Sequence, residues 1–247
     1  MKQNKILPRL IFLVVISMAL FLFYQTRVIA RQEQTKLITE FEESLNLKNN
    51  LEIKETKNKS FSVKKSLMET IGVLYAPDID LQIAVFNNSG QTAISDGAGL
   101  IQGTGSLNPE DRENSIITSH NGDTFKDLFM NVPKLKVGQN FYLKLKNNKT
   151  YKYEIIKTQE PHANEEDKYF LTPNENENYV TLRTCTPIGV NTHRFLATGK
   201  LIEEVETIDA KPVFTLSLYE IGLLSISGIA TILLLTTFKK DRREDGN

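Results

Sequence analysis

Two long apolar runs lie near the ends of the chain, and a more polar stretch separates them. The first run, residues 6–24, is close to the ~20 residues that a helix needs to cross a bilayer. The second, residues 213–238, is longer and contains Glu220 near one end, where a carboxylate at the membrane interface costs little. The pattern predicts a transmembrane helix at each end of the chain.

Basic residues flank the outer end of each run, since Lys2, Lys5 and Arg9 lie in the first nine residues and four more follow the second run (Lys239, Lys240, Arg242 and Arg243). Cytoplasmic flanks of membrane helices are enriched in Lys and Arg, so we expect both termini in the cytoplasm and the intervening domain outside. A cleaved signal peptide is an alternative for the first run, because residues 28–30 fit a cleavage site. A buried core helix is the alternative for the second.

Between the two apolar runs, the pattern of polar and apolar residues changes at about residue 67. Residues 32–65 are polar with apolar positions at roughly helical spacing (Leu37, Ile38, Phe41, Leu45 and Leu47), which predicts a helix packing on the following domain. A flexible stalk is the alternative, and residues 48–62, rich in Lys and Asn, read as a linker.

From residue 71 onward, short apolar or alternating runs are separated by turn residues. They predict strands at 71–75, 81–86, 115–119, 141–146, 151–156, 180–184 and 194–202, with a glycine-rich stretch at 97–104 and a short helix at 123–131. About eight short strands with few helices are typical of a closed β-barrel. The predicted fold class is mainly β.

The expected organisation has five parts. Residues 1–31 form the N-terminus and first membrane helix, 32–66 the stalk, 67–207 the β domain, 208–238 the second membrane helix and 239–247 a basic tail. Lys+Arg and Asp+Glu balance at 30 each, without the basic excess expected of a nucleic-acid binder. The single cysteine excludes an intramolecular disulfide and is a candidate reactive thiol.

That cysteine, Cys185, ends an alternating run, and Arg194 begins the next strand after a turn at 187–191. In a hairpin these two ends face each other. A thiol reacts as its thiolate, which a nearby Arg stabilises. The alternative is a buried, inert cysteine.

Acid–base chemistry beside a thiol normally needs a histidine, and the chain has three. His193 adjoins Arg194 and so faces the other side of its strand, and His162 lies in an acidic loop. His120 ends an apolar strand just before Asn121 and Gly122, a common place for a functional residue.

These segments together resemble a known family. Residues 181–194 read TLRTCTP followed by GVNTHR, which resembles the sortase signature TLxTC…R and is most similar to the form found in class C, the pilin-polymerising sortases. The resemblance extends through GAGLIQGT at 97–104 and ITSHNG at 117–122, and covers roughly residues 71–202.

The resemblance implies an eight-stranded sortase barrel and a membrane-anchored cysteine transpeptidase at a Gram-positive cell surface. It assigns Cys185 as nucleophile, His120 as acid and base, and Arg194 as oxyanion partner, with Thr184, Thr186 and Asn191 as substrate-binding residues. Its partners would be surface proteins or pilins with an LPxTG-like sorting signal, cleaved between Thr and Gly. The acyl-enzyme would pass to a pilin lysine, or to a cell-wall cross-bridge in a wall-anchoring sortase. No cofactor is implied. An alternative of another class is a non-catalytic, membrane-tethered peptide-binding β domain.

Two further features bear on this expectation. The acidic loop at 159–178 corresponds to a connection that helps to hold the sorting signal in sortases. Its carboxylates also suit calcium, although no twelve-residue calcium loop is present.

Many class C sortases carry an Asp-Pro-aromatic lid before the barrel, but no proline lies between Pro8 and Pro77 in this chain. Residues 32–65 offer no obvious aromatic anchor beyond Phe41, and Phe61, the alternative plug, lies among polar residues. We therefore expect an open groove.

The membrane topology can be tested with protease added to intact protoplasts. Because both basic flanks are expected in the cytoplasm, the protease should degrade residues 71–202 and spare both termini. A protected β domain would show that the orientation is wrong.

Overall fold

The structure, a computed structural model, describes residues 6–51, 68–122, 126–174, 177–208 and 218–244. It contains two compact units. One combines Met1–Arg31 with Leu216–Asn247, and the other spans Gln32–Thr215. Phe61 lies outside the described residues.

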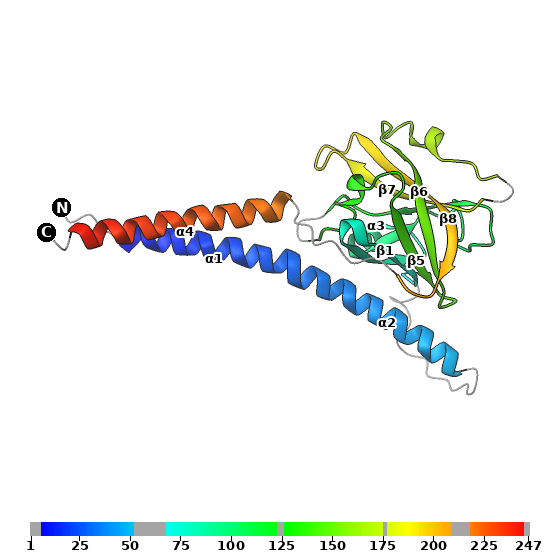
Figure 1. Ribbon diagram of the computed structural model, residues 1–247, viewed down its shortest axis with the longest axis horizontal. Helices are drawn as coiled ribbons and strands as arrows, with labels where there is room; N and C mark the ends of the chain where they lie inside the picture. Colours follow the sequence, from blue (N-terminus) through cyan, green and yellow to red (C-terminus); the bar gives the residue numbers. More distant parts are fainter. Residues whose placement is uncertain (1–5, 52–67, 123–125, 175–176, 209–217, 245–247) are drawn as a thin grey trace. The chain divides into compact units, whose positions relative to one another are not determined.

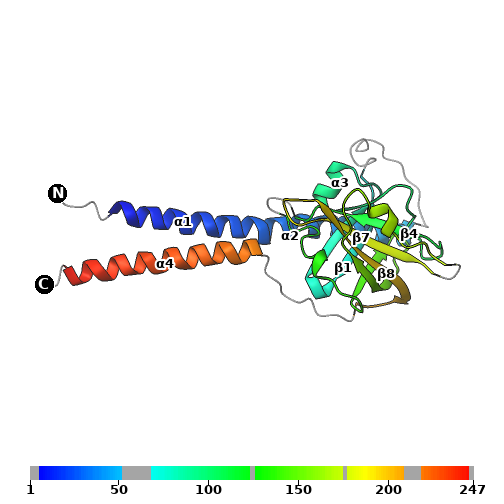
Figure 2. The same ribbon diagram turned by 90° about the horizontal axis from the view of Figure 1, so that it is seen from above.

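The first unit is a pair of helices, α1 (Ile6–Tyr24) and α4 (Leu218–Glu244), which lie side by side (Figures 1 and 2). The Arg9 guanidinium lies 4.4 Å from the centre of the Phe238 ring, so the N-terminal end of α1 contacts the C-terminal part of α4. A five-residue π-helical stretch, Gln25–Ile29, follows α1. Two segments, Leu7–Tyr24 and Glu220–Lys239, are long and apolar enough to cross a membrane, judged by length and composition alone.

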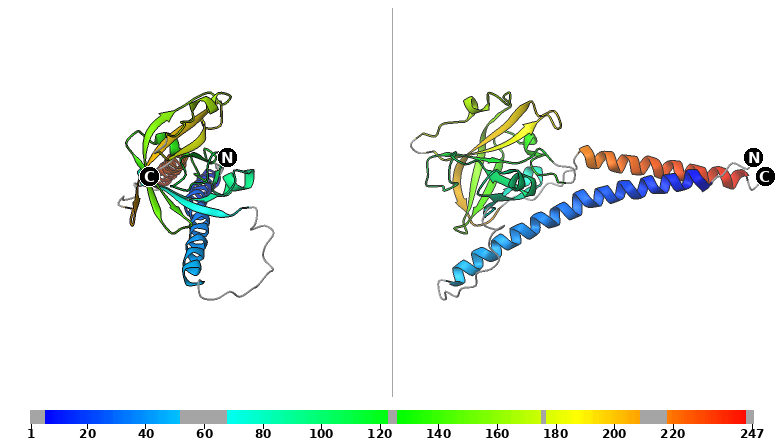
Figure 3. Two further views of the ribbon diagram at one scale, coloured as in Figure 1. Left: turned by 90° about the vertical axis from the view of Figure 1, so that its right-hand side faces the viewer. Right: turned by 180° about the vertical axis from the view of Figure 1, so that it is seen from behind.

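The second unit is built on a closed barrel of eight strands, as the sequence predicts (Figure 3). The strands are β1 (Thr70–Ala76), β2 (Leu81–Phe86), β3 (Ala98–Leu100), β4 (Asn114–Thr118), β5 (Asn140–Leu145), β6 (Thr150–Gln159), β7 (Tyr179–Thr186) and β8 (His193–Val205). Their order around the barrel is β1-β2-β3-β4-β7-β8-β6-β5. β7 is therefore flanked by a parallel neighbour, β4, and an antiparallel neighbour, β8.

The barrel interior holds the main core. Alternate residues of each strand point inward, and on β7 these include Val180 and Leu182, both fully buried in the core cluster. The alternate residues of β7, Thr181 and Arg183, therefore face outward. Cys185 has the same parity as Arg183, so its side chain lies on the outer surface of the barrel.

Helix α2 (Ala30–Leu51) packs on the outside of the barrel, as its periodicity predicts. It includes residues 48–51, which were expected to begin the linker, and the rest of that expected linker, 52–62, lies outside the described residues. Ile38, Phe41 and Leu45 are buried against Val73 and Tyr75 of β1. The prediction is wrong at Leu47, which is 57% exposed. Leu47 lies beyond the stripe of residues that meets the barrel.

The short helix predicted at 123–131 is absent from residues 126–131, the part of this segment that the structure describes. Leu128 has a left-handed backbone (φ 39°), which a right-handed helix excludes. The Phe129 N–H is donated to the His120 carbonyl at 2.9 Å rather than to a residue one turn back. A short helix that the sequence analysis did not predict, α3 (Gln91–Asp96), lies between β2 and β3.

The packing of α2 can be tested with two leucines two residues apart. Leu45 is 3% exposed and Leu47 is 57% exposed. Leu45→Ala should lower the free energy of unfolding by about 2 kcal/mol because it leaves a cavity, whereas Leu47→Ala should change it by less than about 0.5 kcal/mol. Urea unfolding of the full-length protein in detergent, followed by tyrosine fluorescence, measures both. Equal losses would show that α2 does not rest on the barrel through this face.

Candidate active site

Three strands bring the candidate catalytic residues into one row. β4 and β7 are labelled in Figure 2. They pair in parallel from Asn114 opposite Tyr179 to Thr118 opposite Arg183. Continuing this register two residues past the last pair brings His120 level with Cys185. On the other side of β7, Cys185 is paired directly with Arg194 of β8. Residues level with one another on adjacent strands point to the same face, so all three side chains project from the outer surface of the barrel.

The His120 backbone is held from several sides. Ser119 donates its N–H to the Arg183 carbonyl at 3.4 Å and its hydroxyl to the Gly97 carbonyl at 2.6 Å, which ties the end of β4 to β7 and to the end of α3. Gly122 then turns the chain with φ 78°, a conformation that favours glycine. This framework fixes the position of the imidazole at the edge of the sheet.

Asn121 links the histidine segment to the cysteine segment. Its side-chain amide donates to the Cys185 carbonyl at 2.5 Å, and its own side chain is buried. The backbone pairing of β4 with β7 ends at Thr118, and this side-chain hydrogen bond joins the two segments beyond that point. It helps to keep His120 beside Cys185.

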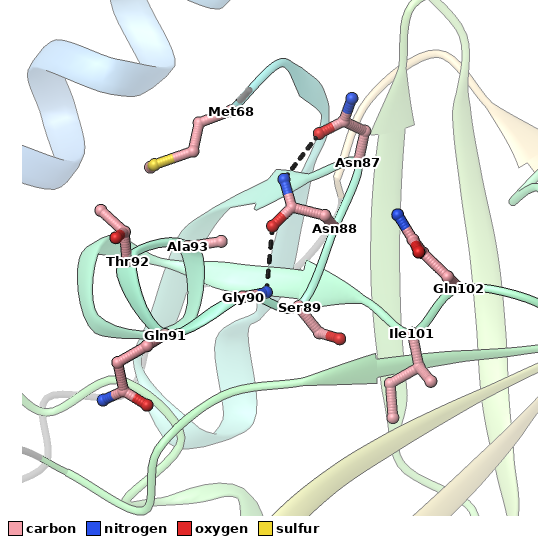
Figure 4. Close-up of a pocket in the computed structure, with 10 residues that line it drawn as sticks. All are labelled: Met68, Asn87, Asn88, Ser89, Gly90, Gln91, Thr92, Ala93, Ile101 and Gln102. Carbon is pink, nitrogen blue, oxygen red and sulfur yellow. Dashed lines mark hydrogen bonds between the residues drawn. The ribbon is translucent and has the colours of Figure 1, made fainter. Parts of the chain in front are cut away.

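The His120 ring contacts Gln91 of α3, with Nε2 3.0 Å from the Gln91 side-chain nitrogen. Gln91 also lines a hollow of about 910 Å³ beside α3 (Figure 4). The residues that line the hollow include uncharged polar side chains, such as Asn87, Asn88 and Gln102, together with apolar ones, such as Met68 and Ile101. The glycine-rich stretch allows this shape, because a Cβ on Gly99 would lie 2.3 Å from the Asn88 carbonyl oxygen.

Arg194 is held mainly by the turn before it. Its Nη1 donates to the Asn191 carbonyl at 2.9 Å and to the His193 carbonyl at 3.0 Å. Asn191 has a left-handed backbone (φ 59°) and donates its N–H to the Pro187 carbonyl, closing the β7–β8 turn. The turn therefore sets the direction of the guanidinium.

The two threonines beside Cys185 have partners within the protein. The Thr184 side chain is fully buried and donates its hydroxyl to the Ser119 carbonyl at 3.0 Å. The Thr186 hydroxyl donates to Glu160 at 3.0 Å. Contact between substrate and Thr184, Thr186 or Asn191 stays a prediction.

The connection from β6 to β7 covers part of the outward face of β4 and β7. Asn114 of β4 donates to the Leu171 carbonyl at 3.0 Å, and Arg183 of β7 binds Glu166 through two hydrogen bonds. At the end of the connection, hydrogen bonds from Lys200 and Tyr179 lower the pKa of Glu177 to about 2, so its carboxylate stays charged and anchors the segment to β8. The connection thus forms one wall beside the row of three residues.

The other two histidines contact each other. The rings of His162 and His193 are 5.0 Å apart, and the two residues form an isolated β-bridge. His193 precedes Arg194 on β8 and so points to the opposite face, as expected from the sequence. In the part of the chain that the structure describes, no group of three or more His, Cys, Asp or Glu residues is arranged to hold a metal ion.

Four residues of this site were missed in the sequence analysis: Gln91, Asn121, Arg183 as a charged partner, and Glu166 as the residue it binds. Arg183 carried a signal, because an arginine at an outward position within an otherwise uncharged strand needs an anion nearby. Gln91 carried none, since α3 has only six residues and no readable periodicity.

Comparisons with known proteins agree with this architecture. A family model described as a sortase domain matches residues 74–202, more than half of the chain. Among solved structures, sortase C of Streptococcus pneumoniae is 26% identical with a TM-score of 0.58, covering 70% of this chain and all of that one. A pilus-related sortase C of Group B Streptococcus is 29% identical with a TM-score of 0.51, covering 70% of this chain and 93% of that one.

A curated relative, sortase A of Bacillus anthracis, is 24% identical over 134 residues, which are 54% of this chain. The match spans only 60% of the length of that relative. The structural neighbours are mostly class C pilin sortases. The family match over more than half of the chain, together with the barrel topology, shows that this protein belongs to the sortase family.

Proposed function

We propose that the protein is a membrane-anchored cysteine transpeptidase that cleaves an LPxTG-like sorting signal between Thr and Gly and transfers the acyl group to an amine. The observation that carries the proposal is that Cys185 on β7 pairs with Arg194 on β8, while His120 follows the end of β4, the other neighbour of Cys185's strand in a sortase barrel. A nucleophile, a proton carrier and a fixed cation on one surface are the groups that acyl transfer needs.

The first half of the reaction forms a thioester. The Cys185 thiolate attacks the carbonyl carbon of the Thr–Gly peptide bond, and the Arg194 guanidinium donates hydrogen bonds to the oxygen as it becomes negative. His120, as imidazolium, gives its proton to the departing glycine nitrogen when the C–N bond breaks. The N-terminal part of the signal remains bound to the sulfur.

In the second half, an amine resolves the thioester. His120, now neutral, takes a proton from the incoming amine, whose nitrogen attacks the thioester carbonyl. The carbon–sulfur bond breaks and the thiolate returns. Gln91 suits both stages, because a side-chain amide donates to a neutral imidazole nitrogen or, after rotation, accepts from a protonated one.

The acceptor we propose is the lysine side chain of a pilin, so that the partners are sortase substrates carrying the signal and a pilin. The support is the likeness to sortases C described as pilus-related or concerned with pilin substrates. A wall-anchoring role, with a cell-wall cross-bridge amine as acceptor, is the second candidate. It is favoured by the match to a sortase A and by the missing Asp-Pro-aromatic motif.

The proposed location is the cell membrane, with the barrel outside the cell. Two apolar helices of sufficient length support membrane anchoring, and the basic residues at both ends of the chain support the orientation. Anchoring places the enzyme beside substrates that are themselves tethered to the membrane.

The test is transfer of an LPxTG peptide to an amine by the full-length protein in detergent, followed by mass spectrometry of the products. Cys185→Ala should abolish transfer, and His120→Ala should slow it by at least ~100-fold because the proton carrier is lost. Arg194→Lys should also be severely impaired, because lysine cannot present a planar fork to the oxyanion.

His162→Ala is the matched control and should retain activity close to that of the wild type. Equal damage from His162→Ala and His120→Ala would refute the assignment of the histidines. A wild-type protein that binds the peptide but leaves it uncut would favour the non-catalytic binding domain. Supplying a pilin-derived lysine peptide and a cross-bridge peptide together separates the two acceptors.

A further inference from the structure

Two arginines on the outer surface of the barrel share a single carboxylate. Glu166, from a short 3-10 helix at Glu166–Tyr169, binds Arg183 with Oε2 2.6 Å from Nε and Oε1 2.6 Å from Nη2. The same Oε1 lies 4.0 Å from Nε of Arg194. All three side chains are largely buried, at 15% exposure for Glu166 and 19% for each arginine.

The two arginines are not bound equally. Arg183 meets both carboxylate oxygens in the bidentate geometry that guanidinium groups prefer, and its third nitrogen, Nη1, donates to Thr118 at 3.1 Å. At 4.0 Å, Arg194 is beyond hydrogen-bond distance from Glu166. Its Nε is buried and has no hydrogen-bond partner among the described residues.

This arrangement matters because Glu166 is close enough to bind Arg194 if it were released. A largely buried carboxylate that loses its partner carries a large desolvation penalty, so it moves to the nearest available cation. Arg194 would then be paired with Glu166, and its positive charge would be neutralised at the place where an oxyanion forms.

We propose that Arg183 is a positioning residue that holds the Glu166 carboxylate away from Arg194 and so keeps the Arg194 guanidinium available to substrate. The inference rests on the proposed role of Arg194 in the reaction. Arg183 touches neither the thiol nor the reacting peptide in this scheme, and it acts through Glu166.

The charges of the three groups give distinct expectations for each variant. Wild-type protein has a net charge of one positive at this cluster, from two arginines and one carboxylate. Arg183→Gln leaves zero and frees Glu166 to bind Arg194. Glu166→Gln removes the competing anion, and the double variant leaves Arg194 alone with its charge intact. The inference therefore predicts that the damage from Arg183→Gln is reversed by a second substitution, Glu166→Gln.

The experiment measures peptide transfer and, separately, alkylation of the sole cysteine by iodoacetamide, using the full-length protein in detergent. Arg183→Gln should slow both reactions by about tenfold or more, whereas Glu166→Gln and the double variant should stay within about threefold of wild type. Alkylation reports the same effect because a nearby arginine that is not hydrogen-bonded to a carboxylate favours the reactive thiolate. Glu165→Gln is the matched control: Glu165 is the adjacent glutamate, is bound to Lys168, and should have no effect.

The outcomes separate this inference from the proposed function. If the wild type transfers no peptide, the proposed function fails, while the alkylation rates still decide whether Arg183 protects Arg194. If Arg183→Gln behaves like wild type, or if the double variant is as slow as Arg183→Gln, the inference is wrong. In the latter case the Arg183–Glu166 pair is a structural clamp, and circular dichroism would show matching losses of thermal stability in both single variants.

Discussion

The register between three neighbouring strands is the constraint on which the site depends. β7 pairs in parallel with β4 and antiparallel with β8, so residues that are 65 positions apart on one side and nine apart on the other lie level with Cys185. A slip of one residue in either pairing would send a candidate catalytic side chain to the inside of the barrel. The buried core residues on alternate positions, such as Val180 and Leu182, oppose such a slip because they would become exposed. The hydrophobic core therefore sets the geometry of a site on the opposite surface.

The residues that contact this row are themselves held by hydrogen bonds to the barrel. Ser119 ties α3 to the end of β4, so Gln91 reaches the imidazole from a short helix that is held in place. Asn121 joins the histidine segment to the Cys185 carbonyl. The connection between β6 and β7 brings one carboxylate, Glu166, to two arginines. Acyl transfer requires charges and hydrogen-bond donors that are already in position, so the proposed reaction depends on these surrounding contacts as well as on the three residues themselves.

Much of this could be predicted from local patterns. The alternation of 180–184 and the turn after it predicted a hairpin in which Cys185 faces Arg194, and the register confirms that pairing. The closed eight-stranded barrel is also confirmed. The features that the sequence did not predict depend on hydrogen bonds between residues that are not neighbours in the sequence. The helix expected at 123–131 does not form over its described part, residues 126–131, where the Phe129 N–H is donated to the His120 carbonyl. The Glu166–Arg183 pair joins two residues that no periodicity relates. Local sequence patterns predict elements, but contacts between loops and strands depend on the finished fold.

The central claim, that Cys185 is the nucleophile of an acyl transfer, is tested most directly by the intact mass of the protein. Full-length protein is incubated with an LPxTG peptide without any amine acceptor, quenched in acid and analysed by mass spectrometry. We expect an adduct on Cys185 that corresponds to the peptide up to and including its Thr. Because it is a thioester, hydroxylamine should remove it. Cleavage of the peptide with no adduct on Cys185, or an adduct that persists in Cys185→Ala, would contradict it.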